Sequence, residues 1–222
     1  VTDNGDFIAV AGATGADANN RDAGASSITL GTNGSINAGT GKVNLVATGT
    51  GASFTNNSTV ATPLQAAIAS IYLPTYNVAA SGGNPAQTYF TKGNLTTTGK
   101  LYNTTYDQST DTGNCKFANC LMPTSGINVF YAATPTISVA PSTGQTSTYG
   151  DKFTASGHTY SGFVDGDTDQ TSGIKGEAVF KVSSDSLSTS GNYTAGTHDI
   201  AYSDGLVSSL GYTFADASTQ TG

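Results

Sequence analysis

Three aspartates at alternate positions are the first residues of this chain that suggest chemistry. Asp165, Asp167 and Asp169 have the spacing of the first three ligands in a calcium-binding loop. A complete EF-hand loop would also need glycine and a bidentate glutamate further on, where the chain has Gln170 and Gly176. The pattern therefore allows one cofactor, a structural calcium ion, and the alternative is a solvated turn.

Enzymatic chemistry finds less support in the titratable residues. His158 and His198 occur in strand-like contexts, and Asp199 adjoins His198, but the serine-rich chain has no Gly-x-Ser-x-Gly elbow around a nucleophile. Paired carboxylates of a glycosidase or lyase are a second possibility, yet two of the four early aspartates, Asp3 and Asp6, adjoin Asn or Gly, as in turns. Arg21 is the only arginine available to bind a sugar acid. We expect a protein that is not an enzyme and has no catalytic residue.

The two cysteines, Cys115 and Cys120, are separated by four residues. Half of a metal site is one interpretation, but the chain has no other cysteine and the two histidines are distant in sequence. A redox motif of the Cys-x-x-Cys type needs a shorter spacing. The spacing favours a local disulfide that fixes one loop in an oxidising compartment.

The calcium-like aspartates belong to a longer stretch, Tyr149–Thr168, around which the chain is organised. Two tight turns flank an apolar segment that suits a strand with one buried face. Glycine permits positive φ and a neighbouring aspartate can bond its own backbone, so both turns have a physical basis. The turn residues are Tyr149, Gly150, Asp151, Gly166, Asp167 and Thr168.

This pattern resembles the MBG-type (YGX) module of large bacterial surface and secreted adhesins. The resemblance continues in Gly191–Ile200, similar to a Gly-rich entry into a late strand, and in Leu210–Phe214, similar to a closing strand. It covers about the last third of the chain and implies a role in adhesion.

The first 61 residues contain short apolar pairs with a spacing of two, separated by Gly, Asn and Asp. Each such strand is too short to hold a core alone, whereas stacked coils would bury a continuous one. The stretch Ser27–Leu45 resembles a pair of coils from exoproteins of the filamentous-haemagglutinin class, which implies a right-handed parallel β-helix. An ordinary sandwich of short hairpins is the alternative.

One helix is predicted, with Thr62 as N-cap, Pro63 as its first residue and Pro74 as its end. The coil repeat is missing from residues 77–135. Aromatic residues and turns there predict an inserted β element that carries the disulfide loop. Exposed tyrosines there could stack on sugars, although core packing is the commoner use. We divide the chain into coils at 1–76, the inserted element at 77–135 and an MBG-like module at 136–222.

Composition restricts the possible partners. The net charge of −7 and pI near 4.4, with eight scattered basic residues, disfavour nucleic acid and anionic membrane surfaces. No apolar run approaches the ~18 residues that a membrane-spanning helix needs. Only 10% of residues are charged and 28 are glycine, which favours many short strands joined by turns.

These patterns predict an all-β protein: short parallel β-helix coils, then a compact antiparallel β module, with at most one short helix. The resemblance implies a secreted, non-catalytic segment of an adhesin at the bacterial cell surface or in a biofilm matrix, with glycans or matrix components as partners. The alternative function is self-assembly, with copies of the chain forming an extracellular fibre.

Overall fold

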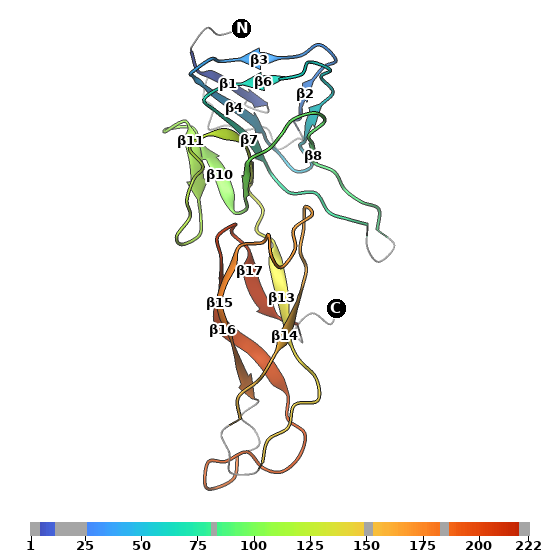
Figure 1. The fold of residues 1–222 in the computed structure, drawn as a ribbon, viewed down its shortest axis with the longest axis vertical. Coiled ribbons are helices and arrows are strands. Elements are labelled where there is room, and N and C mark those ends of the chain that lie inside the picture. The colour runs from blue at the N-terminus through green and yellow to red at the C-terminus, as the bar shows by residue number, and fades with distance from the viewer. Residues whose placement is uncertain (1–4, 12–25, 81–83, 149–152, 183–186, 218–222) are drawn as a thin grey trace. The chain divides into compact units, whose positions relative to one another are not determined.

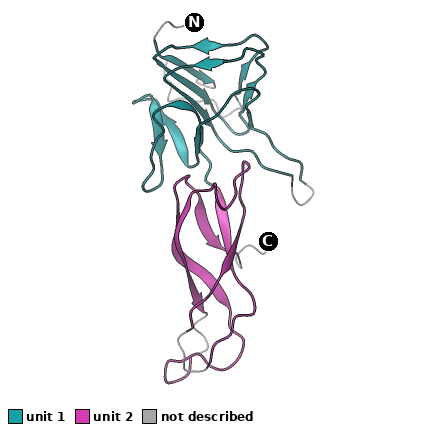
Figure 2. Cartoon of the chain, in the orientation of Figure 1, with its two compact units in different colours: residues 1–134 teal, residues 135–222 magenta. Residues whose placement is uncertain are grey.

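The computed structural model describes residues 5–11, 26–80, 84–148, 153–182 and 187–217. The chain divides into two compact units, residues 1–134 and 135–222 (Figure 2). The described residues form strands and connecting turns in both units, with parallel sheets in the first and mainly antiparallel pairing in the second. The predicted all-β class is confirmed. Nothing in the described part of the chain forms a helix with the length and hydropathy needed to cross a lipid bilayer.

The first unit is a stack of coils whose strands form three parallel sheets (Figure 1). The largest sheet has the order β1-β4-β7-β12-β9 and the other two have the orders β2-β5-β8 and β3-β6. The strands are β1 (Phe7–Ala11), β2 (Ile28–Leu30), β3 (Ile36–Asn37), β4 (Lys42–Ala47), β5 (Phe54–Asn56), β6 (Leu64–Gln65), β7 (Ile68–Leu73), β8 (Phe90–Thr91), β9 (Gly99–Leu101) and β12 (Gly126–Tyr131).

One coil contributes a strand to each of the three sheets. In the register between the second and third coils, Ile28 pairs with Phe54, Ile36 with Leu64 and Lys42 with Ile68. The stretch Ser27–Leu45, predicted to be two coils, is therefore a single coil, because its apolar pairs lie in three different sheets. The repeat that stacks coil on coil is 26 to 28 residues long, as these pairs show.

Apolar side chains fill the interior of the stack in rows that follow the register. Val43, Leu45 and Ile71 are almost completely buried, and the rings of Phe54 and Phe90 stack at 5.8 Å between neighbouring coils. Complete burial of an aliphatic or aromatic side chain of this size contributes about 1.5–3 kcal/mol. The short strands are therefore stable only as a stack, which is the expected reason for the coils.

The helix predicted over 62–74 is wrong, because this segment forms β6 and β7. Its apolar run is compatible with either structure, since a strand buried on both faces has no alternation. β7 lies between β4 and β12 in the large sheet, and its residues from Ala69 to Leu73 are all buried, so side chains on both faces of this strand are covered. Ladder bonds to two neighbours and burial outweigh the local signals of Thr62 and Pro63.

The segment 77–135, predicted as a separate inserted element, lies within the first compact unit as far as Thr134. It supplies β8, β9 and β12 to the sheets of the stack, and also a hairpin of β10 (Thr104–Asp107) and β11 (Thr112–Cys115). The hairpin covers the outer face of the large sheet, where the Tyr106 ring contacts Tyr72 at 5.1 Å. Asn44 Nδ2, on the same face, donates to the carbonyl oxygen of Asp111 at 3.0 Å.

The disulfide between Cys115 and Cys120 is confirmed, with Cα atoms 6.2 Å apart. It closes a short loop from Cys115, the last residue of β11, to Cys120. The sulfur of Met122 lies 3.3 Å from Cys115 Sγ. The tyrosines of this segment that pack into the unit, Tyr102, Tyr106 and Tyr131, are buried. They serve core packing and do not present a sugar-stacking surface.

The second unit combines a three-stranded sheet with a long hairpin. The sheet has the order β14-β13-β17, with β13 (Thr136–Pro141) antiparallel to β14 (His158–Ser161) and parallel to β17 (Thr213–Asp216). The hairpin pairs β15 (Ile174–Val182) with β16 (Ile200–Ser208). Its irregular register next to Gly176 accommodates Gly205 on the opposite strand, and both residues have positive φ.

Candidate functional site

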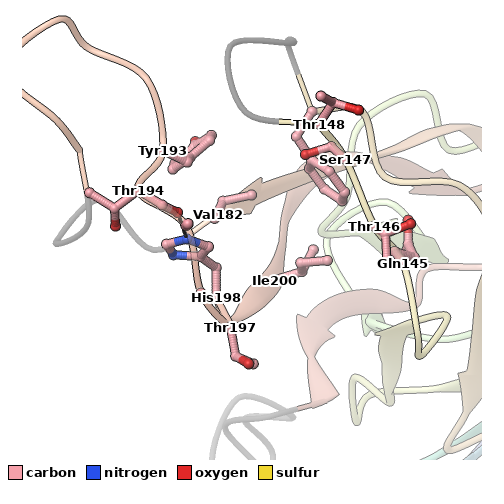
Figure 3. Close-up of a pocket in the computed structure, with 13 residues that line it drawn as sticks. Gln145, Thr146, Ser147, Thr148, Val182, Tyr193, Thr194, Thr197, His198 and Ile200 are labelled. Carbon is pink, nitrogen blue, oxygen red and sulfur yellow. Dashed lines mark hydrogen bonds between the residues drawn. The ribbon is translucent and has the colours of Figure 1, made fainter.

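A hollow of about 410 Å³ in the second unit is the candidate site, and we call it the threonine hollow. Figure 3 shows Gln145–Thr148, from the β13–β14 connection, on one side and Tyr193, Thr194, Thr197 and His198, from the β15–β16 connection, on the other. Val182 at the end of β15 and Ile200 at the start of β16 lie between them. Phe153, Ala195 and Gly196 complete the lining. The hairpin therefore positions the floor, and two loops form the walls.

Local hydrogen bonds fix both loops. Gln145 Nε2 donates to the Ser142 carbonyl oxygen at 2.8 Å, and Gln145 Oε1 accepts from the Ser156 N–H at 2.6 Å, so one side chain ties the two ends of its loop. On the other side, Ser188 and Asn192 form a turn in which the Ser188 N–H donates to the Asn192 carbonyl oxygen at 2.7 Å. The walls are thus held in place by side chain and backbone bonds within the loops.

His198 is held by the loop that precedes it. Its Nε2 lies 2.7 Å from the carbonyl oxygen of Thr194, and because a carbonyl can only accept, Nε2 carries the proton. In the neutral ring Nδ1 is then an acceptor, and it is buried without a hydrogen-bond partner among the described residues. The ring also contacts Tyr193, with centroids 5.7 Å apart. The imidazole therefore has one nitrogen in a hydrogen bond, and its other nitrogen is buried without a partner among the described residues.

The lining can recognise a neutral polyhydroxyl ligand. The hydroxyl groups of Thr146, Ser147, Thr148, Thr194 and Thr197 are donors and acceptors on exposed residues. The half-buried rings of Phe153 and Tyr193 supply apolar faces. Among the thirteen described residues that line the hollow, none carries a carboxylate. Such a mixture of hydroxyl groups and rings suits a sugar better than a strongly charged molecule.

The structure places His158 in different surroundings from His198. His158 Nε2 lies 2.7 Å from the Tyr160 hydroxyl, and its ring contacts Phe180 at 5.9 Å. The two histidines therefore belong to separate clusters, one on β14 and β15 and the other in the threonine hollow.

The turn that contains Gly166, Asp167 and Thr168 is packed onto the closing strand region. The Tyr212 hydroxyl donates to Asp167 Oδ2 at 2.8 Å and accepts from the Val164 N–H at 3.2 Å. Asp165 and Gly166 have φ values of 51° and 75°, as the predicted turn requires. The first turn of the family motif, Tyr149, Gly150 and Asp151, lies outside the described residues.

The Asp167 carboxylate is thus engaged by Tyr212, and Asp169 contributes its carbonyl oxygen to the Ser172 hydroxyl at 3.1 Å. Over the described residues, no group of three or more His, Cys, Asp or Glu side chains is placed so that it could hold a metal ion. Asp165, Asp167 and Asp169 do not form such a group. The bonds of the Tyr212 hydroxyl to Val164 and Asp167 join this turn to the residues that precede β17.

Sequence reasoning did not find the threonine hollow. Its lining comes from four separate stretches of ordinary Thr, Ser, Gly and apolar residues, none of which forms a motif. The one available signal was His198 inside the Gly191–Ile200 segment, which we interpreted as a strand entry.

Comparisons with known protein families, with curated proteins and with solved structures find no match to this chain. The fold and the threonine hollow are therefore the basis for any functional proposal.

Proposed function

We propose that this chain is a non-catalytic, adhesive and structural segment of a bacterial cell-surface or extracellular matrix protein. In this proposal the coil stack is the scaffold and the second unit presents the threonine hollow to glycans. The observation that carries the proposal is the lining of that hollow, where five hydroxyl-bearing side chains and two aromatic rings surround His198.

Two further features support this function. The disulfide Cys115–Cys120 suits an oxidising compartment outside the cytosol. The parallel stack buries its apolar residues within and between coils, as quasi-one-dimensional scaffolds do, and such stacks are extended by adding coils.

The test is binding of the purified chain to a glycan array and to cell surfaces. We expect glycan-dependent binding that Tyr193→Ala weakens about tenfold, because the change removes an aromatic face from the hollow. Tyr89→Ala is the matched control, since Tyr89 lies in the first unit and its hydroxyl bonds Gln87. Equal binding by both variants, or release of cleaved glycan, would contradict the proposal.

Self-assembly into a fibre is the second candidate function, and the open edges of the stack favour it. β1 and β9 end the large sheet, and each pairs with one neighbour among the described strands, β4 and β12. An edge strand offers unpaired backbone groups to another chain. Electron microscopy of the purified chain tests this function: regular filaments would support it, and monodisperse particles would contradict it.

A further inference from the structure

A second hollow adjoins the threonine hollow in the same unit. It has a volume of about 770 Å³ and is lined by residues 153–155, 178–182 and 191–193. Three side chains line both hollows: Phe153, Val182 and Tyr193. The two hollows are therefore neighbouring parts of one groove, with an apolar ridge of these three residues between them.

The size of this groove indicates a ligand built from more than one unit. Small-molecule sites typically enclose roughly 300–1,000 Å³, and each hollow alone lies in that range. A ligand that fills both must extend across the ridge of Phe153, Val182 and Tyr193. A chain of linked sugars meets this requirement, with successive rings on either side of the ridge.

The second hollow combines apolar side chains with polar groups. Its apolar part is formed by Ala155, Ala178, Val179 and the Phe180 ring, and Val179 is 48% exposed. Thr154 and the charged Lys181 also line it. The polar groups among its lining residues include the Asn192 amide, which can both donate and accept hydrogen bonds. An apolar wall beside an amide suits a substituent that has a methyl group next to an amide, as an acetamido group does.

We propose that the two hollows are adjoining subsites of one groove that binds an oligosaccharide containing an N-acetylated sugar. This inference rests on the proposed adhesive function and specifies its ligand. The acetamido methyl lies against Ala155, Ala178 and Val179, the acetamido amide pairs with Asn192, and the next sugar places its hydroxyl groups in the threonine hollow.

Isothermal titration of the full chain with three β-1,4-linked tetrasaccharides tests the inference. The probes are tetramers of N-acetylglucosamine, glucosamine and glucose, which share backbone and length but differ at one substituent. We expect the acetylated tetramer to bind about tenfold more tightly than the glucose tetramer, the discrimination that a few apolar atoms give in a fitted pocket. The acetylated monosaccharide should bind more weakly than its tetramer, because it occupies a single subsite.

Variants of the second hollow separate the subsites. Ala155→Asp places a charge on the apolar wall and should abolish the preference for the acetylated tetramer. Asn192→Ala keeps the backbone bonds between Asn192 and Ser188 and removes only the amide, so it provides a second test if Ala155→Asp unfolds. Thr197→Val changes the threonine hollow and should weaken both neutral tetramers equally.

Each alternative outcome has a distinct meaning. Equal affinity for the acetylated and glucose tetramers, both lowered by Tyr193→Ala, overturns the acetamido assignment and leaves the adhesive function standing. Unchanged selectivity in folded Asn192→Ala and Ala155→Asp overturns the second subsite. If no glycan binds, both the inference and the glycan-binding function fail. Binding of an extended peptide along β15, with no response to sugars, would assign the groove to strand addition instead.

Discussion

Tyr212 joins the Asp165–Thr168 turn to the end of the second unit, and removing its hydroxyl group should loosen that junction. The ring is 5% exposed, and its hydroxyl donates to Asp167 Oδ2 and accepts from the Val164 N–H. Tyr212→Phe keeps the ring and its edge contact with Phe163 at 6.5 Å. The change therefore isolates the hydrogen bonds from the packing.

The expected loss of stability comes from the groups that lose the hydroxyl as a hydrogen-bond partner. A hydrogen bond to a charged group contributes about 1.5–3 kcal/mol, and the half-buried Val164 N–H also loses this partner. We expect Tyr212→Phe to lower the free energy of opening of this region by about 2 kcal/mol. Asp167→Asn retains an acceptor near Tyr212, so it should cost less than Tyr212→Phe.

Hydrogen exchange read by mass spectrometry measures this change, because it resolves peptides of one unit from those of the other. A loss of about 2 kcal/mol makes exchange roughly 30-fold faster where opening limits it. The effect should appear in peptides from β14, β15 and β17 and not in those of the coil stack. Tyr89→Phe serves as control, since its hydroxyl bonds Gln87 at the surface.

The reasoning is refuted if Tyr212→Phe leaves exchange in these peptides within twofold of the unchanged chain. It is also refuted if exchange accelerates in both units to the same extent, because the hydrogen-bond partners of the hydroxyl, Val164 and Asp167, lie in the second unit.

Three further predictions concern other parts of the fold. Cys115→Ser/Cys120→Ser should destabilise the β10–β11 hairpin by about 2 kcal/mol, the contribution of a short closed loop, measured by hydrogen exchange of its peptides. Burial raises the pKa of Tyr72 to about 12. The folded chain therefore keeps the phenol proton at a pH near 10, where the unfolded chain begins to lose it. The stability of the coil stack should therefore fall by up to about 3 kcal/mol between pH 10 and pH 12 in urea titrations, and less in Tyr72→Phe. Gly205→Ala should cost about 2 kcal/mol or more in thermal unfolding, since φ is positive and a Cβ would collide with the backbone of β15. Gly166→Ala, at positive φ in open space, should cost less.

Local chemistry carried most of the fold prediction. The apolar pairs around Ile8, Ile28 and Val43 predicted strands that the structure contains, because a spacing of two places both residues on one face. The Cys115–Cys120 spacing predicted the disulfide, because the chain has no other cysteine.

The errors arose where distant residues decide the outcome. The segment from Thr62 to Pro74 satisfies local helix rules, yet its partners β4 and β12 come from about 26 and 58 residues away, as the pairs of Ile68 with Lys42 and Gly126 show. The coil repeat was underestimated for the same reason, since the pairing of Ile28 with Phe54 is invisible within Ser27–Leu45. The threonine hollow was missed because no short stretch contains more than one wall of it.

The position of β12 has a mechanical consequence. β12 is the last strand of the first unit, and it is hydrogen bonded on one side to β7 and on the other to β9. Any tension transmitted along the backbone from the second unit reaches the stack at the end of this strand. Pulling an edge strand off a sheet breaks one set of backbone hydrogen bonds, one bond after another. Extracting β12 requires its hydrogen bonds to β7 and to β9 to break together. The chain therefore anchors its junction in the interior of a sheet, where a pulling force meets the greatest resistance.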